Sequence, residues 1–164
     1  IINSLSKYFS MTGWRIGWMI LPEDLIAPAE KLAQNLYISA PTPNQIAAIQ
    51  AFDCMPELDK HVERYKENRE ILLQGLPQSL LGNAAPCDGA FYIYADISAL
   101  SNDSIGFAKK LLDETGVATT PGVDFDPING HRYLRLSFAG STQAMHEAVT
   151  RISLFVERYK KDAA

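Results

Sequence analysis

A lysine near the amino terminus lies between small hydroxyl residues and an arginine flanked by glycines. Lys7 follows Ser4 and Ser6, and Arg15 comes shortly after it. A lysine amine condenses with an aldehyde to form a Schiff base, whereas the planar guanidinium of an arginine binds a phosphate, and serine hydroxyls add hydrogen bonds. Pyridoxal phosphate is the common cofactor that carries both an aldehyde and a phosphate. The segment therefore predicts a site for this cofactor.

A second arginine, Arg135, lies in the middle of a segment that is predicted to be a strand. Leu134, Leu136 and Phe138 would share one face of that strand, so Arg135 would project from the other face. A guanidinium fixed on a strand is a two-pronged donor that suits a carboxylate ligand. The pattern alone also leaves open a structural salt bridge, because charged residues in sheets are usually paired or solvated.

Several segments, in the expected order, resemble the landmarks of one enzyme family. Ser4-x-Ser6-Lys7, followed by Gly13-x-Arg15-x-Gly17-Trp18, is similar to the cofactor-lysine signature of the class I/II pyridoxal-phosphate-dependent aminotransferases, in the aspartate aminotransferase superfamily of fold type I. Further segments that resemble this family are residues 40–45, 89–92, 120–125 and 133–139. In that family the lysine lies well past the middle of the chain, so the sequence resembles only the carboxy-terminal portion of such an enzyme.

The resemblance implies a function and gives roles to the residues above. It implies transamination between an amino acid and a 2-oxo acid, with pyridoxal 5'-phosphate as cofactor and a homodimer as the full-length protein. Lys7 would be the catalytic lysine and would bind the cofactor together with Ser4, Ser6 and Arg15, while Arg135 would bind the α-carboxylate of the substrate. Family residues that hold the cofactor ring come from earlier in the chain, so we expect the segment alone to have little or no activity.

The fold class implied is α/β: the end of a large α/β domain, a long linking helix and a small α+β domain. We place the remnant of the large cofactor-binding domain at residues 1–56. Residues 16–21 form a continuous apolar run that predicts a strand buried on both faces of a parallel sheet. Without the rest of the large-domain sheet, this strand would expose its backbone and its apolar faces. Residues 23–36 have helical periodicity, and a second helix would begin at Asn44 as its N-cap and end at Pro56. The residues expected to face inward in that helix are Ile46, Ile49 and Phe52.

The linking helix is predicted over residues 57–76, where apolar residues recur at helical spacing. The small domain would then cover residues 77–164. Its order of a strand, a helix, two strands and a helix is typical of an α+β domain. The expected elements are a strand at 91–97, a helix capped by Asp103 and Ser104 and stopped at Gly116, strands at 117–119 and 133–138, and a last helix from Ser141.

Composition limits the classes of function. The 164 residues carry a formal net charge of −4 and the basic residues are scattered, which argues against a nucleic-acid partner. No apolar run reaches the roughly 18 residues that span a bilayer, so we expect no membrane partner. Cys54 and Cys87 lack ligand-like spacing, which predicts a reducing cytoplasm and neither a disulfide nor a metal site. The histidines share no metal-binding or triad pattern with other residues.

Other polar and aromatic residues have more ordinary interpretations. Asp124 and Asp126 lie in a turn rich in Pro and Gly, where side-chain capping of the turn is a sufficient explanation. Tyr8 and Trp14 would be packing residues, because aromatic groups beside strands mostly fill core. Arg132 lies outside the Tyr-x-Arg-x-Ser pattern and would be a surface residue.

Two alternative functions stay open. The same lysine and arginine positions also serve β-lyases of this superfamily, because the carbanion is common to both reactions. The segment could instead be a noncatalytic regulatory or dimerisation module derived from such an enzyme. The residues that select the amino donor and acceptor are not recognisable, although Tyr37 and Phe125 would suit an apolar pocket as well as plain packing.

Overall fold

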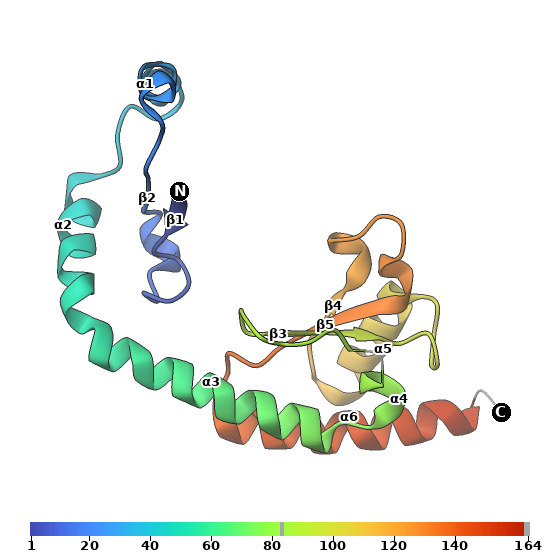
Figure 1. Cartoon of the computed structure of the whole chain (residues 1–164). Coiled ribbons are helices and arrows are strands. Elements are labelled where there is room, and N and C mark those ends of the chain that lie inside the picture. The colour runs from blue at the N-terminus through green and yellow to red at the C-terminus, as the bar shows by residue number, and fades with distance from the viewer. Residues whose placement is uncertain (83, 163–164) are drawn as a thin grey trace. The chain divides into compact units, whose positions relative to one another are not determined.

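The computed structural model describes residues 1–82 and 84–162. The chain forms two compact units, Ile1–Val62 and Glu63–Ala164, and the division falls within the long helix α3 (Met55–Gly75) (Figure 1). The helix predicted over residues 57–76 is therefore present, with both ends slightly nearer the amino terminus.

The first unit begins with a two-stranded antiparallel sheet. β1 (Ile2–Ser4) pairs with β2 (Gly17–Met19), and Ser4 lies opposite Gly17. A Cβ atom at Gly17 would lie only 2.7 Å from the carbonyl oxygen of Asn3, so this close approach requires glycine. The parallel pairing predicted for this strand is not found, because β2 is antiparallel to β1. β2 is exposed, as expected for this strand without the rest of the large-domain sheet.

Two helices precede α3 in the first unit. α1 (Glu23–Leu36) has the predicted bounds. α2 (Thr42–Ala51) begins after Pro41 rather than at Asn44, and a 3₁₀ turn, η2 (Phe52–Cys54), follows it before Pro56. The inward orientation predicted for this helix is also wrong, because an apolar stripe marks a face but only a packed neighbour buries it. The exposed fractions are 59% for Ile46, 66% for Ile49 and 49% for Phe52.

The second unit contains a three-stranded antiparallel sheet in the order β3-β5-β4. β3 (Tyr92–Asp96) pairs with β5 (Tyr133–Ser137) along its whole length. The shorter β4 (Thr120–Pro121) pairs with the other edge of β5. The strands predicted at 91–97 and 133–138 are confirmed with shorter bounds. The strand predicted at 117–119 is wrong, because the ladder with β5 begins only at Thr120.

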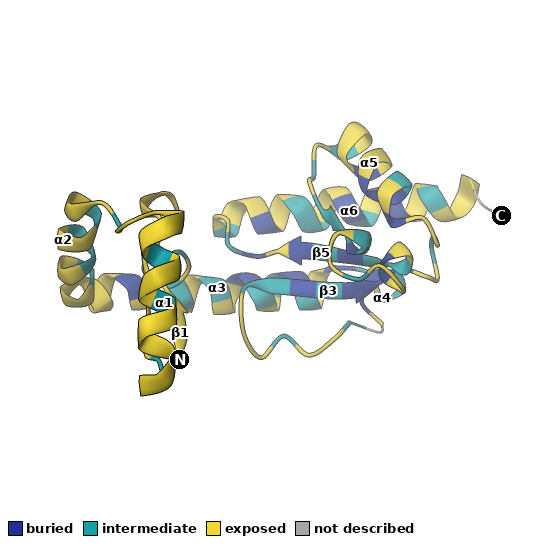
Figure 2. Cartoon of the chain, turned by 90° about the horizontal axis from the view of Figure 1, so that it is seen from above, coloured by how far each residue is buried: buried dark blue, intermediate teal, exposed yellow. Residues whose placement is uncertain are grey.

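Helices cover one face of this sheet. α4 (Gln78–Leu81), α5 (Ser104–Thr115) and α6 (Thr142–Asp162) share its core with the second half of α3. Figure 1 shows that part of α3 and α6 on the same side of the sheet, and Figure 2 shows buried residues in both β3 and β5. The exposed fractions of 0% for Leu134 and 4% for Leu136 confirm the inward face of β5. The unit is a two-layer α+β domain, as predicted.

The ends of α5 and α6 agree with their predicted capping residues. Asp103 accepts a hydrogen bond from the N–H of Gly106 at 3.0 Å at the start of α5. Gly116 ends that helix in the left-handed conformation, with a φ of 71° that favours glycine. The hydroxyl of Ser141 accepts a hydrogen bond from the N–H of Ala144 at 3.2 Å at the start of α6.

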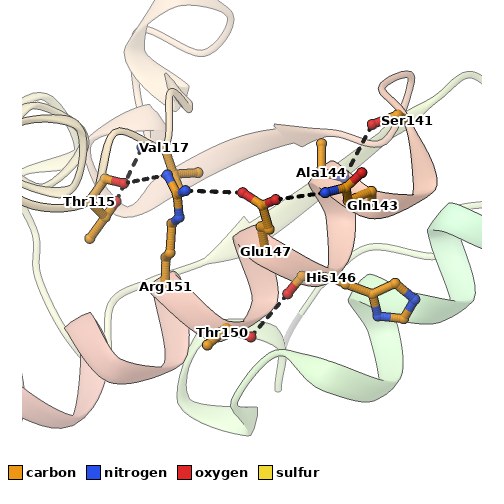
Figure 3. A network of polar contacts seen from close by, with 9 residues as sticks. All are labelled: Thr115, Val117, Ser141, Gln143, Ala144, His146, Glu147, Thr150 and Arg151. Carbon is orange, nitrogen blue, oxygen red and sulfur yellow. Dashed lines mark hydrogen bonds and ion pairs between the residues drawn. The ribbon is translucent and has the colours of Figure 1, made fainter.

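A polar network joins the end of α5 to α6 (Figure 3). Arg151 donates to the carbonyl oxygen of Thr115 at 3.2 Å and pairs with Glu147 at 3.0 Å, and Gln143 donates to Glu147 at 3.3 Å. The side chains of Arg151 and Glu147 are about half exposed, so their ion pair contributes at most about 1 kcal/mol. The network places a cation at the carboxyl end of α5, where the helix dipole favours positive charge.

One polar side chain of α3 is completely buried in the second unit. Asn68 is 0% exposed, and its Nδ2 donates to the carbonyl oxygens of Phe138 and Gly140 at 2.9 and 3.0 Å. Its Oδ1 has no hydrogen-bond partner in the described part of the chain. Asn68 therefore ties α3 to the segment that leaves β5 and leads into α6.

Candidate functional site

Residues 5–16 form a loop that joins β1 to β2 and carries Lys7. The N–H of Met11 donates to the carbonyl oxygen of Leu5 at 3.1 Å, and both side chains are buried, at 7% and 2% exposed. The N–H of Ser10 donates to the carbonyl oxygen of Lys7 at 3.0 Å, so Lys7 is the first residue of a tight turn. The buried ends fix the loop, while Lys7 itself is exposed.

The two serines of the lysine signature differ in their contacts. Ser4 is exposed, and its Oγ accepts a hydrogen bond from the N–H of Ser6 at 3.1 Å. An accepting hydroxyl keeps its own hydrogen, so Ser4 has a donor to offer to an anionic oxygen. Ser6 is held through its backbone, because the hydroxyl of Thr12 donates to its carbonyl oxygen at 2.6 Å. Thr12 thus helps to fix the loop, a role that the sequence pattern does not signal.

Arg15 has a left-handed backbone, with φ of 50° and ψ of 52°. This conformation costs a non-glycine residue about 1–3 kcal/mol, so the surroundings must enforce it. The Nη1 of Arg15 donates to the carbonyl oxygen of Thr12 at 3.0 Å, and the Nδ2 of Asn44 donates to that of Trp14 at 2.6 Å. The side chain of Asn44, which was predicted to cap α2, therefore supports the lysine loop instead.

The charge of this segment suits an anion. No acidic residue occurs before Glu23 in the sequence, whereas Lys7 and Arg15 are both cationic. Arg15 forms no ion pair with an acidic residue among residues 1–82 and 84–162. Ser4 and Arg15 provide donors for a phosphate, and Lys7 provides an amine for an aldehyde. The residues present therefore fit pyridoxal 5'-phosphate.

The aromatic residues of the loop have different surroundings. The Tyr8 ring packs edge-on against Phe9, with ring centroids 5.1 Å apart, in line with the packing interpretation. Its hydroxyl also donates to Asp59 at 2.7 Å, and this hydrogen bond raises the pKa of Tyr8. Trp14 is 44% exposed, so the packing role predicted for it is wrong within the described structure.

Arg135 projects from the face of the sheet that the helices do not cover. Its guanidinium carbon lies 4.2 Å from the ring centroid of Tyr92 and 4.2 Å from that of Phe125. Its Nη2 donates to the hydroxyl of Thr120 at 3.4 Å. No acidic side chain pairs with Arg135 in the part of the chain that the structure describes, so the alternative of a structural salt bridge is not found there. The positive charge is available to a carboxylate ligand.

Arg132, the competing arginine, is engaged by a buried acid. Its Nη2 lies 2.7 Å from Oδ2 of Asp96, whose side chain is 3% exposed. Burial acts to raise the pKa of Asp96, but hydrogen bonds from Ser98 and the charge of Arg132 outweigh it and hold this pKa below its usual range. The prediction of a plain surface residue is incomplete, because Arg132 is the structural partner of a buried carboxylate.

The loop after β4 is held by the capping contacts of Asp126. Its Oδ1 accepts hydrogen bonds from the N–H groups of Asn129 at 3.0 Å and Ile128 at 2.9 Å, which lower the pKa of Asp126. Turn capping is thus confirmed for Asp126. Gly122 begins the loop where it meets the sheet, and a Cβ atom there would lie 2.8 Å from the hydroxyl of Tyr94.

The described residues contain no group of three or more His, Cys, Asp or Glu side chains that could hold a metal ion. Cys54 and Cys87 are free thiols. None of the helices in the described ranges is long and apolar enough to cross a membrane.

Comparison with known proteins identifies relatives over nearly the whole chain. The family model for aminotransferase class I and II matches residues 1–152. The chain is 45% identical over 154 residues to the valine–pyruvate aminotransferase of Mycobacterium tuberculosis, a match that covers 93% of the chain and 40% of that relative. It is 37% identical over 160 residues to the (5-formylfuran-3-yl)methyl phosphate transaminase of Methanocaldococcus jannaschii, a match that covers 96% of this chain and 42% of that relative. The chain thus spans about 40% of the length of these relatives.

Solved structures give a consistent result. An aminotransferase from Mycobacterium tuberculosis matches with a TM-score of 0.92 and 43% identity, covering 96% of this chain and 41% of that one. An aspartate aminotransferase variant from Thermus thermophilus matches with a TM-score of 0.82 and 31% identity, covering 93% of this chain and 42% of that one.

Proposed function

Since this chain belongs to the class I and II aminotransferase family and has the fold-type I architecture of its solved relatives, we propose that it contributes to transamination between an amino acid and a 2-oxo acid. The observation that carries the proposal is the family match over residues 1–152, with Lys7 and Arg15 in a segment without acidic residues. The activity is proposed for the enzyme as a whole, because the chain spans about 40% of its relatives' length.

Three residues of the first unit would hold the phosphate of pyridoxal 5'-phosphate. Ser4 offers a hydroxyl donor, and Arg15 offers a guanidinium whose position is set by its left-handed backbone and its bond to Thr12. Ser6 would contribute a further contact through its hydroxyl, since its backbone is already held by Thr12. When bound, the cofactor supplies an electron sink for the charge that develops on the substrate carbon.

Lys7 has two tasks in this proposal. Its amine would hold the cofactor through the aldehyde carbon until the amine of the amino acid replaces it there. The released Nζ would then accept the proton from Cα of the amino acid and later donate it as a general acid. The exposed position of Lys7 at the start of a turn leaves its side chain accessible for both tasks.

Arg135 binds the α-carboxylate of the substrate in this proposal. The support is its place on the open face of the sheet and the absence of an acidic partner among the described residues. The α-carboxylate is common to all amino acids and 2-oxo acids, so Arg135 serves both halves of the exchange and does not select the side chain. We further infer a cytoplasmic homodimer for the whole enzyme, with support from the family resemblance and the two free cysteines.

Covalent labelling tests the assignment of Lys7. The chain is mixed with pyridoxal 5'-phosphate, reduced with borohydride, and the added mass is located by peptide mass spectrometry. We expect Lys7 to be labelled in preference to other exposed lysines such as Lys31, because Ser4 and Arg15 in the same segment as Lys7 offer donors to the phosphate. Arg15→Gln should lower the labelling of Lys7, whereas Arg64→Gln, which changes another exposed arginine, should not. Uniform labelling of all lysines would contradict the assignment.

The catalytic role requires the whole enzyme. In a Lys7→Ala variant of the full-length protein we expect turnover to fall by at least about 100-fold, the lower end of the contribution of a positioned general base. Exchange of amino groups between an amino acid and a 2-oxo acid is the reaction to measure, because release of ammonia instead would indicate a lyase. Normal turnover in this variant would end the proposal.

A further inference from the structure

The guanidinium of Arg135 lies close to two aromatic rings. Its central carbon is 4.2 Å from both the Tyr92 and the Phe125 ring centroid, well within the roughly 6 Å range of cation–π contacts. Tyr92 comes from β3, the strand beside β5, and Phe125 comes from the loop that follows β4. Two segments from opposite edges of β5 thus meet on one side chain.

The two rings limit how a ligand can approach. Each ring takes up space beside the guanidinium, so a carboxylate has fewer directions from which to reach it. The hydroxyl of Thr120 already accepts a hydrogen bond from Nη2 at 3.4 Å. The guanidinium has further N–H donors in its plane, which can bind both oxygens of a carboxylate. A flexible arginine on an open strand would have no such restriction.

We propose that Tyr92 and Phe125 are positioning residues that fix the plane of Arg135 for carboxylate binding. The inference rests on the proposed function only in that the bound carboxylate is that of the substrate. Both rings act through Arg135, because they hold one rotamer of a long side chain before the ligand arrives. The benefit is the conformational freedom that Arg135 no longer loses on binding.

Phe125 is the more informative of the two rings to change. Tyr92 belongs to a strand, where it also packs on Phe91 with ring centroids 4.4 Å apart, so its loss would disturb the sheet. Phe125 is 51% exposed, and its loop is held by backbone hydrogen bonds, from the N–H groups of Phe125 and Asp126 to the carbonyl oxygen of Gly122 at 2.9 Å each. The loop therefore keeps these backbone hydrogen bonds when the ring is removed.

A matched set of variants separates the ring from its surroundings. Phe125→Leu keeps an apolar side chain but removes the π-face, and Phe125→Tyr restores a ring. Ile128→Ala is the control, because Ile128 lies in the same loop, is 78% exposed and is apolar without being aromatic. Arg135→Lys identifies the arginine signal that the experiment follows.

The measurement uses the 164-residue chain labelled with ¹⁵N-arginine, observed by NMR at the Nε–H groups and titrated with sodium propionate against sodium chloride. We expect the Arg135 signal to be displaced by ring currents in the unchanged chain and to move toward the ordinary arginine position in Phe125→Leu. Propionate should bind about 3- to 10-fold more weakly to Phe125→Leu, the effect of having to fix one long side chain on binding. Phe125→Tyr should restore both properties, and Ile128→Ala should change neither.

The outcomes distinguish this inference from the proposed function. If propionate shifts the Arg135 signal equally in the unchanged chain and in Phe125→Leu, the positioning role is overturned while carboxylate binding by Arg135 stands. If propionate shifts no Arg135 signal even in the unchanged chain, carboxylate binding by Arg135 fails, and the positioning role fails with it. A role in stability alone would lower the unfolding midpoint of Phe125→Leu without changing its propionate affinity, which would also overturn the inference.

Discussion

Replacing Asn68 by alanine removes the donor that serves the carbonyl oxygens of Phe138 and Gly140. The bond to Phe138 is buried, so that carbonyl loses its donor without access to water, at a cost of about 1–3 kcal/mol. The bond to Gly140 is only partly buried, and its loss costs about 1 kcal/mol. Removing Oδ1, which is buried without a partner, stabilises the fold by roughly 1 kcal/mol. The second unit should therefore lose about 2 kcal/mol of its free energy of unfolding.

Asn68→Asp should be more damaging at neutral pH, although it preserves the size of the side chain. The carboxylate would be buried against two carbonyl oxygens without a donor, which costs about 3–5 kcal/mol by analogy with an unpaired buried charge. As the pH falls toward 4, the carboxyl group becomes protonated and can donate one hydrogen bond. The difference in free energy of unfolding between Asn68→Asp and Asn68→Ala should therefore become smaller at low pH.

Urea unfolding followed through the amide NMR signals of β3 and β5 measures the stability of the second unit. The two tryptophans, Trp14 and Trp18, both lie in the first unit, so their fluorescence reports that unit separately. Gln74→Ala is the control, because it changes an exposed amide on the same helix and should stay within about 0.5 kcal/mol. A midpoint shift in Asn68→Ala no larger than in Gln74→Ala, or equal effects of alanine and aspartate at pH 7, would refute this role of Asn68.

Two further predictions concern the second unit, and one concerns the first. The folded-state pKa of Asp96 is below its unfolded value of about 3.9, so its stabilisation is complete above that value and is lost as the pH falls through the lower folded-state pKa. Urea midpoints between pH 5 and 2 should fall less steeply in Asp96→Asn than in the unchanged chain. Gly122→Ala should cost about 1–3 kcal/mol, because its Cβ would lie 2.6 Å from a backbone oxygen, while Gly89→Ala, with open space around it, should be tolerated by the same assay. Ile38→Gly should raise the thermal midpoint of the first unit, followed by fluorescence, by relieving about 1 kcal/mol of strain at a φ of 67°; a lowered midpoint would contradict this.

The helices that the sequence predicts best are those with local signals at their ends. α5 has an acidic N-cap at Asp103 and a glycine at Gly116, and both signals lie within one turn of the helix they bound. α1 has its predicted bounds for a similar reason, since Pro22 and the acidic residues after it mark its start. α2 is the counterexample, because Asn44 looks like a cap but donates to Trp14, thirty residues away in the chain.

Burial is predicted well only where partners are present. Leu134 and Leu136 alternate with polar residues and do lie inside, because several helices pack on that face. Apolar residues of β2 and α2 are exposed in the described structure, although they are of the same kind as those that fill the core of the second unit. A periodic pattern states which face of an element is apolar, and the elements packed on it decide whether that face leaves water.

The sequence by itself determined the family and the fold class. It also singles out Lys7, Arg15 and Arg135 as the residues proposed to carry the chemistry, because that chemistry needs those residue types within short, fixed motifs. The tertiary structure alone decided what surrounds them. Asn44 of α2 supports the lysine loop, and Phe125, in the loop after β4, lies against Arg135 of β5. These contacts join different elements of the chain, so they exist only once folding has brought their backbones together and have no local pattern by which to predict them.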